Sequence, residues 1–418
     1  MNSEGDEQAR STADLVARRS YGKLVAFLAA RTRDVSAAED ALSEAFALAL
    51  KDWPRNGCPN NPEAWLLAVA RRRAIDAFRG RQRGEAAGEQ LRLISDGFAE
   101  AEAAPEIPDQ RLALMFACAH PAIDSAIRAP LILQAVLGLD ARTISSAFLA
   151  SPAAMSKRLV RAKEKIREAG IPFRIPARDE LPARLGAVLD AIYAAFTEGW
   201  TDPAGADVIR RDLTEEALFL ARLAAELLPG EAEALGLLAL MLYAHARRRA
   251  RRQAEGEYVP LAAQDPSLWD PQMMQEAERL LLRAAPMGSI GRYQLEAALQ
   301  SAHVFRCRTG EANWPHVVQL YDALYALVPS PVVALNRALA IAEVDGPQAG
   351  LQAMPDDPRL AEYQPYWAAR AELLSRDGAA GEAGHAYDLA IGLERDPAVR
   401  RFLERRRAAL PHTTNRAN

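Results

Sequence analysis

The chain has 418 residues, of which 50% are hydrophobic but only 6% aromatic, and a formal net charge of −4. This length allows about two to four domains, each with a core of its own. The scarcity of aromatic residues and the absence of long β-branched runs argue against sheets and favour an all-α fold.

Charge is distributed unevenly along the chain. Basic residues cluster in 71–83, 157–167 and 247–252, whereas 85–109 is acidic. The small net charge therefore does not exclude binding to nucleic acid, and the basic stretches are the candidate surfaces.

The sequence predicts a cytoplasmic protein that does not associate with a membrane. The N-terminus is polar and lacks an apolar signal region. The longest apolar stretch, 234–244, is too short to span a bilayer. Three scattered cysteines, Cys58, Cys118 and Cys307, predict free thiols and no disulfide framework.

Two helices are predicted at the start of the chain. After a polar segment expected to be disordered, apolar spacing predicts a helix over Leu15–Thr32. A second helix is predicted to begin at Ser36, where Glu39 completes an S-x-x-E capping box, and to end at Asp52.

A loop and an arginine-rich helix follow. Asn, Gly and Pro residues predict a loop over Trp53–Pro62, and the next helix begins at Pro62. One face of that helix is apolar. The other face carries Arg71, Arg72, Arg73, Arg79, Arg81 and Arg83.

The segment from Ala126 to Gly170 predicts two short helices, a tight turn and a longer cationic helix. Gly138 is expected to end the first helix, and Ser151-Pro152 supplies an N-cap followed by a proline at the first position of the last helix. This arrangement is typical of a helix-turn-helix whose last helix enters a major groove. The alternative is an ordinary helical hairpin with a solvated basic face.

Six segments divide the predicted chain. They are 1–84, an acidic linker 85–108, the helix-turn-helix domain 109–172, a linker 173–182, a helical domain 183–410 and a disordered tail 411–418. In 183–410 a small-large-small-Pro pattern resembles the second helix of a tetratricopeptide repeat. A plain helical bundle is the alternative.

No catalytic motif is present in the sequence. It contains no phosphate-binding glycine loop, no H-E-x-x-H, no G-x-S-x-G and no C-x-x-C. Cys118 lies two residues from His120 without a second ligand pair, so a zinc site is not expected. The sequence predicts a protein that is not an enzyme and holds neither cofactor nor metal.

Two blocks of sequence resemble a known family. The string DVSAAEDALSEAFALALKDWP followed by NPEAWLLAVARRRAIDAFR is similar to region 2 of bacterial RNA polymerase sigma factors of the extracytoplasmic-function (ECF) class. The blocks RLALMFACAHPAI and GLDARTISSAFLASPAAMSKRLVRAKEKIREAGIPFRIP resemble region 4 of the subgroup with a C-terminal tetratricopeptide-like extension.

The resemblance implies partners and contact residues. Core RNA polymerase would be bound through its β′ clamp helices and β flap, with Asp40 and Glu44 on the clamp side. The loop 53–62 would capture a flipped base of the −10 element, and helix 152–167 would enter the major groove of the −35 element. The implied DNA contacts are Asn60, Asn61, Arg71, Arg72, Arg73, Asp76, Arg79, Thr143, Ser156, Lys157, Arg158, Arg161 and Lys163.

Some alternatives stay open at the level of sequence. Turn chemistry explains Asn60 and Asn61 as well as base contact does. A helix-turn-helix regulator with a sensing domain is the alternative function, and an enzyme built on the helical domain is a third. For the sigma-factor reading, residues 183–410 are expected to regulate the protein by packing on regions 2 and 4 or by recruiting another protein.

Overall fold

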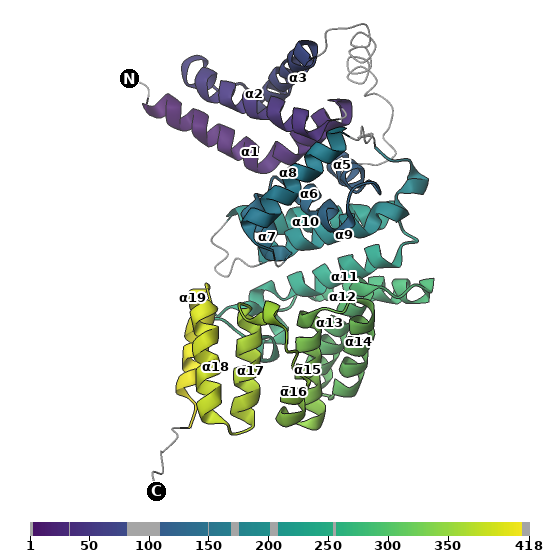
Figure 1. Cartoon of the computed structure of the whole chain (residues 1–418), viewed down its shortest axis with the longest axis vertical. Coiled ribbons are helices and arrows are strands. Elements are labelled where there is room, and N and C mark those ends of the chain that lie inside the picture. The colour runs from purple at the N-terminus through teal and green to yellow at the C-terminus, as the bar shows by residue number, and fades with distance from the viewer. Residues whose placement is uncertain are drawn as a thin grey trace. The chain divides into compact units, whose positions relative to one another are not determined.

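The computed structural model describes residues 3–32, 34–81, 109–148, 150–168, 175–200, 208–253 and 256–411. Every regular element within these residues is a helix, so the prediction of an all-α fold is confirmed. The chain divides into two compact units (Figure 1). One comprises Met1–Thr201 and Val208–Leu227, and the other comprises Asp202–Asp207 and Leu228–Asn418.

The first unit begins with three helices, α1 (Ser3–Thr32), α2 (Val35–Asn56) and α3 (Pro62–Arg81). They pack against one another through apolar side chains such as Leu24, Leu42 and Leu66, all of which are buried. The prediction of a disordered start is wrong, because α1 already begins at Ser3. Its early turns bury Ala9 and Ala13, which are too small to form a strong apolar pattern in the sequence.

Both predicted ends of α2 are corrected. The N-cap is Asp34 and not Ser36. The carboxylate of Asp34 accepts a hydrogen bond from the backbone N–H of Ala37 at 3.1 Å. The helix continues past Asp52 to Asn56 and is closed by Gly57, which has φ +85°. Burial of Trp53 favours this extra turn, so the connection to α3 is only 57–61.

Four shorter helices follow: α5 (Gln110–Cys118), α6 (Ser125–Ala135), α7 (Ala141–Ala147) and α8 (Pro152–Glu168). Gly138 adopts φ +67° after α6, where its N–H donates to the carbonyl oxygen of Gln134 at 3.1 Å. The predicted stop at this glycine is confirmed. The Ser151 hydroxyl also accepts from the N–H of Ala154 at 3.3 Å, which confirms the predicted N-cap of α8.

Two further helices, α9 (Pro182–Trp200) and α10 (Val208–Leu227), belong to the first unit. Helix α9 packs on α5 and α6, and α10 packs on α9 and α5. The buried guanidinium of Arg184 on α9 donates to the carbonyl oxygen of Phe116 at 3.2 Å and pairs with Glu180 at 3.1 Å. Arg111 on α5 pairs with Asp109 at 2.9 Å and with Glu216 on α10. These contacts attach α9 and α10 to the helices that precede them.

The second unit is a succession of helices, with neighbours along the chain packed against each other. Its α-helices are α11 (Ala232–Ala246), α12 (Pro271–Ala284), α13 (Arg292–Thr309), α14 (Trp314–Leu327), α15 (Pro331–Asp345), α16 (Pro347–Ala353), α17 (Gln364–Arg376), α18 (Ala380–Leu393) and α19 (Pro397–Ala408). The carboxylate of Glu233 on α11 accepts from the N–H groups of Tyr293 and Gln294, at 2.9 and 3.1 Å. It thereby caps α13 from a neighbouring helix.

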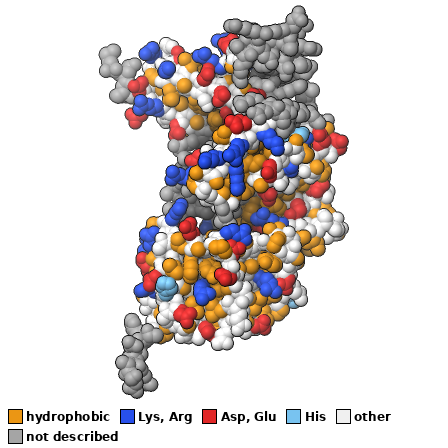
Figure 2. All heavy atoms as spheres, in the orientation of Figure 1, with side chains coloured by type: hydrophobic (Ala, Val, Ile, Leu, Met, Phe, Trp, Pro, Cys, Tyr) orange, Lys and Arg blue, Asp and Glu red, His pale blue; other side chains and the backbone are white. Residues whose placement is uncertain are grey.

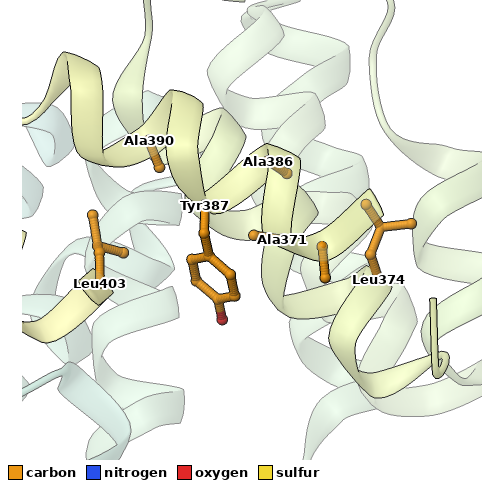
Figure 3. Packing of buried hydrophobic residues seen from close by; sticks show 7 residues of the cluster. Ala371, Leu374, Ala386, Tyr387, Ala390 and Leu403 are labelled. Carbon is orange, nitrogen blue, oxygen red and sulfur yellow. The ribbon is translucent and has the colours of Figure 1, made fainter. Parts of the chain in front are cut away.

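The end of the second unit has a compact apolar cluster. Figure 3 shows Tyr387 of α18 among the small side chains Ala371, Ala386 and Ala390, with Leu403 of α19 beside them. The Tyr387 hydroxyl donates to Glu372 at 3.1 Å, which satisfies its polar end. The small and large residues of the predicted repeat pattern therefore serve as core positions in this pair of helices.

No described helix has both the length and the apolar character needed to cross a membrane.

Candidate nucleic-acid interface

Helix α8 presents a cationic surface because its buried apolar residues lie on one side, while Val160 is an exposed apolar residue among the cations. Met155 and Leu159 are buried against the neighbouring helices, as the spacing predicted. On the remaining surface of α8 the exposed side chains include Ser156, Lys157, Arg158, Arg161 and Lys165. Figure 2 shows Lys and Arg side chains gathered over the part of the first unit that holds α8.

A cavity of about 420 Å³ lies beside this cationic surface. Its lining includes the cations Arg158, Arg161 and Lys165, the apolar side chains Ile123 and Ile127, and the carboxylate of Asp124. Three cations next to an apolar wall can hold an anionic group while its less polar part is shielded from water.

Lys163, one of the predicted DNA contacts, contacts helix α2 and does not lie on the exposed cationic surface of α8. Its ammonium donates to the carboxylate of Glu39 on α2 at 2.7 Å, and both side chains are largely buried. Burial raises the pKa of Glu39 above its usual value, and attraction to Lys163 opposes that rise. The five predicted contacts on α8 therefore divide into four exposed side chains and one engaged inside the unit.

Thr143 lies at the start of α7, half-buried. Its backbone N–H donates to the carboxylate of the N-cap Asp140 at 2.7 Å. Hydrogen bonds from the backbone and side chain of Thr143 hold the pKa of Asp140 below its usual value. Thr143 thus helps to order the turn that precedes α8.

The second basic surface is on α3. Arg71, Arg72, Arg73 and Asp76 are exposed, whereas the side chain of Arg79 lies outside the described residues. Arg73 approaches Glu44 of α2 at 3.5 Å, and both groups are well exposed, so the pair contributes little to stability. Guanidinium groups displayed along one helix can follow a phosphate backbone.

The connection between α2 and α3 is shorter than the predicted loop. Trp53 is buried in α2 and meets the ring of Trp65 edge-on, with centroids 5.5 Å apart. It is a core residue and not part of a base-binding loop. Asn60 is exposed, and the side-chain oxygen of Asn61 accepts from the N–H of Ala64 at 3.0 Å. Turn chemistry therefore accounts for Asn61, while Asn60 stays available to solvent.

The acids predicted to face polymerase, Asp40 and Glu44, are both exposed on α2. Sequence reasoning missed the neighbouring Glu39, which it assigned to a capping box. The capping role is filled by Asp34, so the Glu39 side chain is free to reach Lys163. The S-x-x-E pattern alone does not show whether Glu39 caps the helix or forms an ion pair with a residue far along the chain.

The described residues include no cluster of metal-ligating side chains, since no group of three or more His, Cys, Asp or Glu among them could hold a metal ion. Cys118 is fully buried, and burial raises the pKa of its thiol far above the usual range, which makes it a poor ligand and nucleophile.

Two segments of the chain match known families. Residues 16–84 match sigma-70 region 2, and residues 184–285 match a family of unknown function (DUF6596). The uncharacterized protein R00370 of Rhizobium meliloti is 41% identical over 368 residues, which cover 86% of this chain and 87% of that protein.

A more distant similarity covers part of the chain. A probable RNA polymerase sigma factor, RfaY, of Xanthomonas campestris is 32% identical over 166 residues, or 36% of this chain and 40% of that protein. No solved structure matches the chain.

Proposed function

We propose that this chain, which belongs to the same protein family as R00370 of Rhizobium meliloti, is a sigma factor that directs core RNA polymerase to promoters. The match of residues 16–84 to sigma-70 region 2 carries this proposal. The partial similarity to a probable sigma factor supports it as well.

In this proposal the chain is of the ECF class, and its two basic surfaces have separate tasks. Helix α8 is the second helix of a helix-turn-helix and reads the −35 element through Ser156, Lys157, Arg158 and Arg161. Helix α3 follows the promoter backbone at the −10 element through Arg71, Arg72 and Arg73, with Asn60 close by in the short loop. Base capture there needs help from polymerase, because unstacking a base costs a few kcal/mol.

Polymerase binding is assigned to α2. Asp40 and Glu44 are exposed carboxylates on one helix, which suits a cationic surface such as the β′ clamp helices. The β flap is expected to contact the helices α5–α8.

We assign a regulatory role to the second unit, as a tetratricopeptide-like module that controls the first unit or recruits a protein. Its successive helices with small-large packing support this assignment. Removing residues after Leu227 tests it. The deletion is expected to change promoter-specific transcription, and unchanged activity with unchanged promoter control would rule out a regulatory role.

The test of the main proposal combines two measurements on the purified chain. We expect co-elution with core RNA polymerase and run-off transcripts from specific genomic fragments, both absent when Asp40 and Glu44 are changed to Lys. If the chain binds duplex DNA tightly but neither co-elutes nor supports transcription, it is instead a helix-turn-helix regulator.

A further inference from the structure

One buried arginine of the second unit has no acid to neutralise it. Arg247, the C-cap residue of α11, is 7% exposed. Its guanidinium donates to the carbonyl oxygen of Tyr243 at 3.1 Å and to the side-chain oxygen of Gln300 on α13 at 2.6 Å, and both acceptors are neutral. Among the described residues no carboxylate forms an ion pair with it. A buried cation of this kind is costly unless an anion compensates its charge.

The group placed to compensate this charge is the thiol of Cys307 on α13. Burial and the neighbouring charge of Arg251 lower the pKa of Arg247 to about 10, and the negative charge that the Cys307 sulfur can carry acts in the opposite direction. Cys307 is half-buried, so small molecules in the solvent can reach its sulfur. Arg247 thus provides a fixed positive charge beside an accessible thiol.

A histidine donates to the same sulfur. The Nε2 atom of His303, one turn before Cys307 on α13, lies 3.5 Å from the sulfur, and its Nδ1 atom lies 3.1 Å from a guanidinium nitrogen of Arg306. Since a guanidinium only donates hydrogen bonds, Nδ1 is the acceptor in that pair. Burial and the charges of Arg247 and Arg306 lower the pKa of His303 to about 4, so the ring is neutral at physiological pH. Its one proton is therefore on Nε2 and faces the sulfur.

Arg306 is held in the position that fixes this tautomer. Its guanidinium donates to the side-chain oxygen of Asn313 at 2.8 Å and lies over the ring of Trp314, 3.9 Å from the centroid. Asn313 in turn donates to the carbonyl oxygen of Ala302 at 2.8 Å. The direction of the His303 N–H is therefore set by the packing of α13 against the start of α14.

A further buried donor beside His303 has no partner. Trp269, just before α12, is 6% exposed, and its indole N–H makes no hydrogen bond. The rings of Trp269 and His303 lie side by side, with centroids 6.0 Å apart. Unpaired buried donors are uncommon and occur at sites with a redox or binding role. This one belongs to the same cluster as the thiol.

We propose that Cys307 is a reactive thiol that hydrogen peroxide oxidises to a sulfenic acid, with Arg247 and His303 stabilising the negative charge on the reacting atoms. Reactive cysteines occur in partly exposed positions next to cations. This inference does not depend on the proposed sigma-factor function.

The reaction needs no group besides the thiol and the peroxide. The thiolate attacks one peroxide oxygen, an S–O bond forms, the O–O bond breaks and hydroxide leaves. The hydroxide takes up the proton that the thiol released and becomes water. The sulfur is oxidised by two electrons, and the peroxide is reduced by the same two.

Trapping of sulfenic acid in the full chain tests the proposal directly. The chain is treated with hydrogen peroxide and dimedone, which alkylates sulfenic acids, and each cysteine peptide is measured by mass spectrometry. Cys58 is the internal reference, because it is also half-buried but its thiol faces the hydroxyl of Thr12, at 3.6 Å. We expect Cys307 to be labelled at least about tenfold faster than Cys58. Equal rates, or faster labelling of Cys58, overturn the proposal.

The role of Arg247 is tested with a charged and a neutral alkylating reagent. Altered accessibility changes the rates with iodoacetate and iodoacetamide alike, whereas a nearby cation favours the anionic iodoacetate. Arg247→Met is expected to lower the ratio of the two rates at Cys307 by about threefold, and Arg247→Lys, which keeps the charge, is expected to preserve it. The matched control is Arg249→Met, which removes an exposed arginine two positions further along. An unchanged ratio in Arg247→Met overturns the role of this charge.

Two substitutions of His303 test the hydrogen bond to the sulfur. Glutamine keeps an N–H donor, and leucine removes it. Oxidation of Cys307 by peroxide is expected to slow by about tenfold in His303→Leu and by less than about threefold in His303→Gln. Equal rates in the two variants overturn the donor role. Circular dichroism melts show whether each variant keeps its fold, and the comparison of Cys307 with Cys58 in the native chain decides the proposal if a variant does not.

Discussion

Among the cations on α8, Arg161 is the best position at which to test DNA contact without disturbing the packing of the helix. It is exposed and lines the cavity beside α8, so its removal leaves the buried side of the helix intact. We expect Arg161→Ala to weaken binding to promoter duplex and to lower the log–log salt slope by about one, since one fewer counterion is released.

The matched control for Arg161 is Arg283→Ala, which removes an exposed arginine from α12 in the second unit. Fluorescence anisotropy over a salt series measures both variants. Equal slopes for the native chain and Arg161→Ala would contradict a phosphate or base contact at this residue.

Asp140 makes the turn before α8 sensitive to pH. Its pKa is lowered in the folded chain by hydrogen bonds from Thr143, so its contribution is fully present above the ordinary aspartate pKa of about 3.9 and is lost as the pH falls through the lowered folded value. We expect Asp140→Ala to reduce the stability of the first unit by about 1 kcal/mol at neutral pH. The loss should shrink as the pH falls below the ordinary aspartate pKa and through the lowered folded pKa of Asp140, and Asp140→Asn, which keeps an acceptor, should lose less.

Denaturant unfolding of the native chain and both Asp140 variants across this pH range gives the measurement. A stability difference that is constant with pH would show that the carboxylate charge is not involved.

Residue-level prediction from sequence succeeded where a local rule decides the outcome. Ser151 and Gly138 have the predicted capping and stopping roles because these depend on neighbouring backbone groups. Lys163 was expected to contact DNA, and that contact stays a prediction, since its ammonium is paired with Glu39 in the structure. An ion pair across 124 positions depends on tertiary packing that no local pattern encodes.

At the scale of elements, α9 is attached to the helices before it by a buried cation. Arg184 is almost fully buried and satisfies the carbonyl of Phe116, so its removal leaves polar groups without a partner. We expect Arg184→Met to destabilise the first unit by about 3 kcal/mol.

Hydrogen exchange of the α5 amides measures the effect of Arg184→Met, and Arg142→Met on the exposed surface of α7 serves as its control. Equal protection in both variants would mean that α9 is not needed to hold α5.

The helices themselves were largely predictable, whereas their ends were not. The spacing of apolar residues gave α3, α6 and α8 close to their observed positions. The buried residues of α3 and α8 recur at helical spacing, whereas α6 is buried at most positions along its length. Alanine-rich turns in α1 and a proline-containing turn in α2 were misjudged. In both places burial against neighbouring helices overrides a weak or unfavourable local signal.

At the scale of the whole molecule, the compact units set where the chain can be cut. A chain ending after Leu227 keeps the ion pair of Arg111 with Glu216 and the hydrogen bond from Arg184 to the carbonyl oxygen of Phe116, whereas one ending at Leu181 loses both. We expect the longer fragment to unfold cooperatively and the shorter one to have a fluctuating second half.

Circular dichroism melts of the two fragments check this expectation. If the fragment ending at Leu181 melts as sharply as the longer one, the folded core of the first unit does not require α9 and α10.

The proposed division into six segments, with a helical domain over 183–410, stays a prediction. Sequence punctuation by Pro and Gly marks helix ends well, but it does not reveal which neighbour a helix will pack on. The fold class could be predicted from composition alone. The arrangement of the two basic surfaces could not be predicted, because it depends on contacts between distant parts of the chain. These are the close approach of Gly22 to the carbonyl oxygen of Val136 and the ion pair of Glu39 with Lys163.

The rate at which the Cys118 thiol is alkylated reports how often the first unit opens. Its thiol is fully buried at the end of α5, and its raised pKa suppresses the reactive thiolate, whereas Cys58 and Cys307 are only half-buried. Alkylation of Cys118 must therefore wait for the surrounding helices to separate. Mass spectrometry after alkylation of intact cells gives the labelling rate of Cys118 relative to those of Cys58 and Cys307. This ratio would measure how often the first unit opens inside the cell.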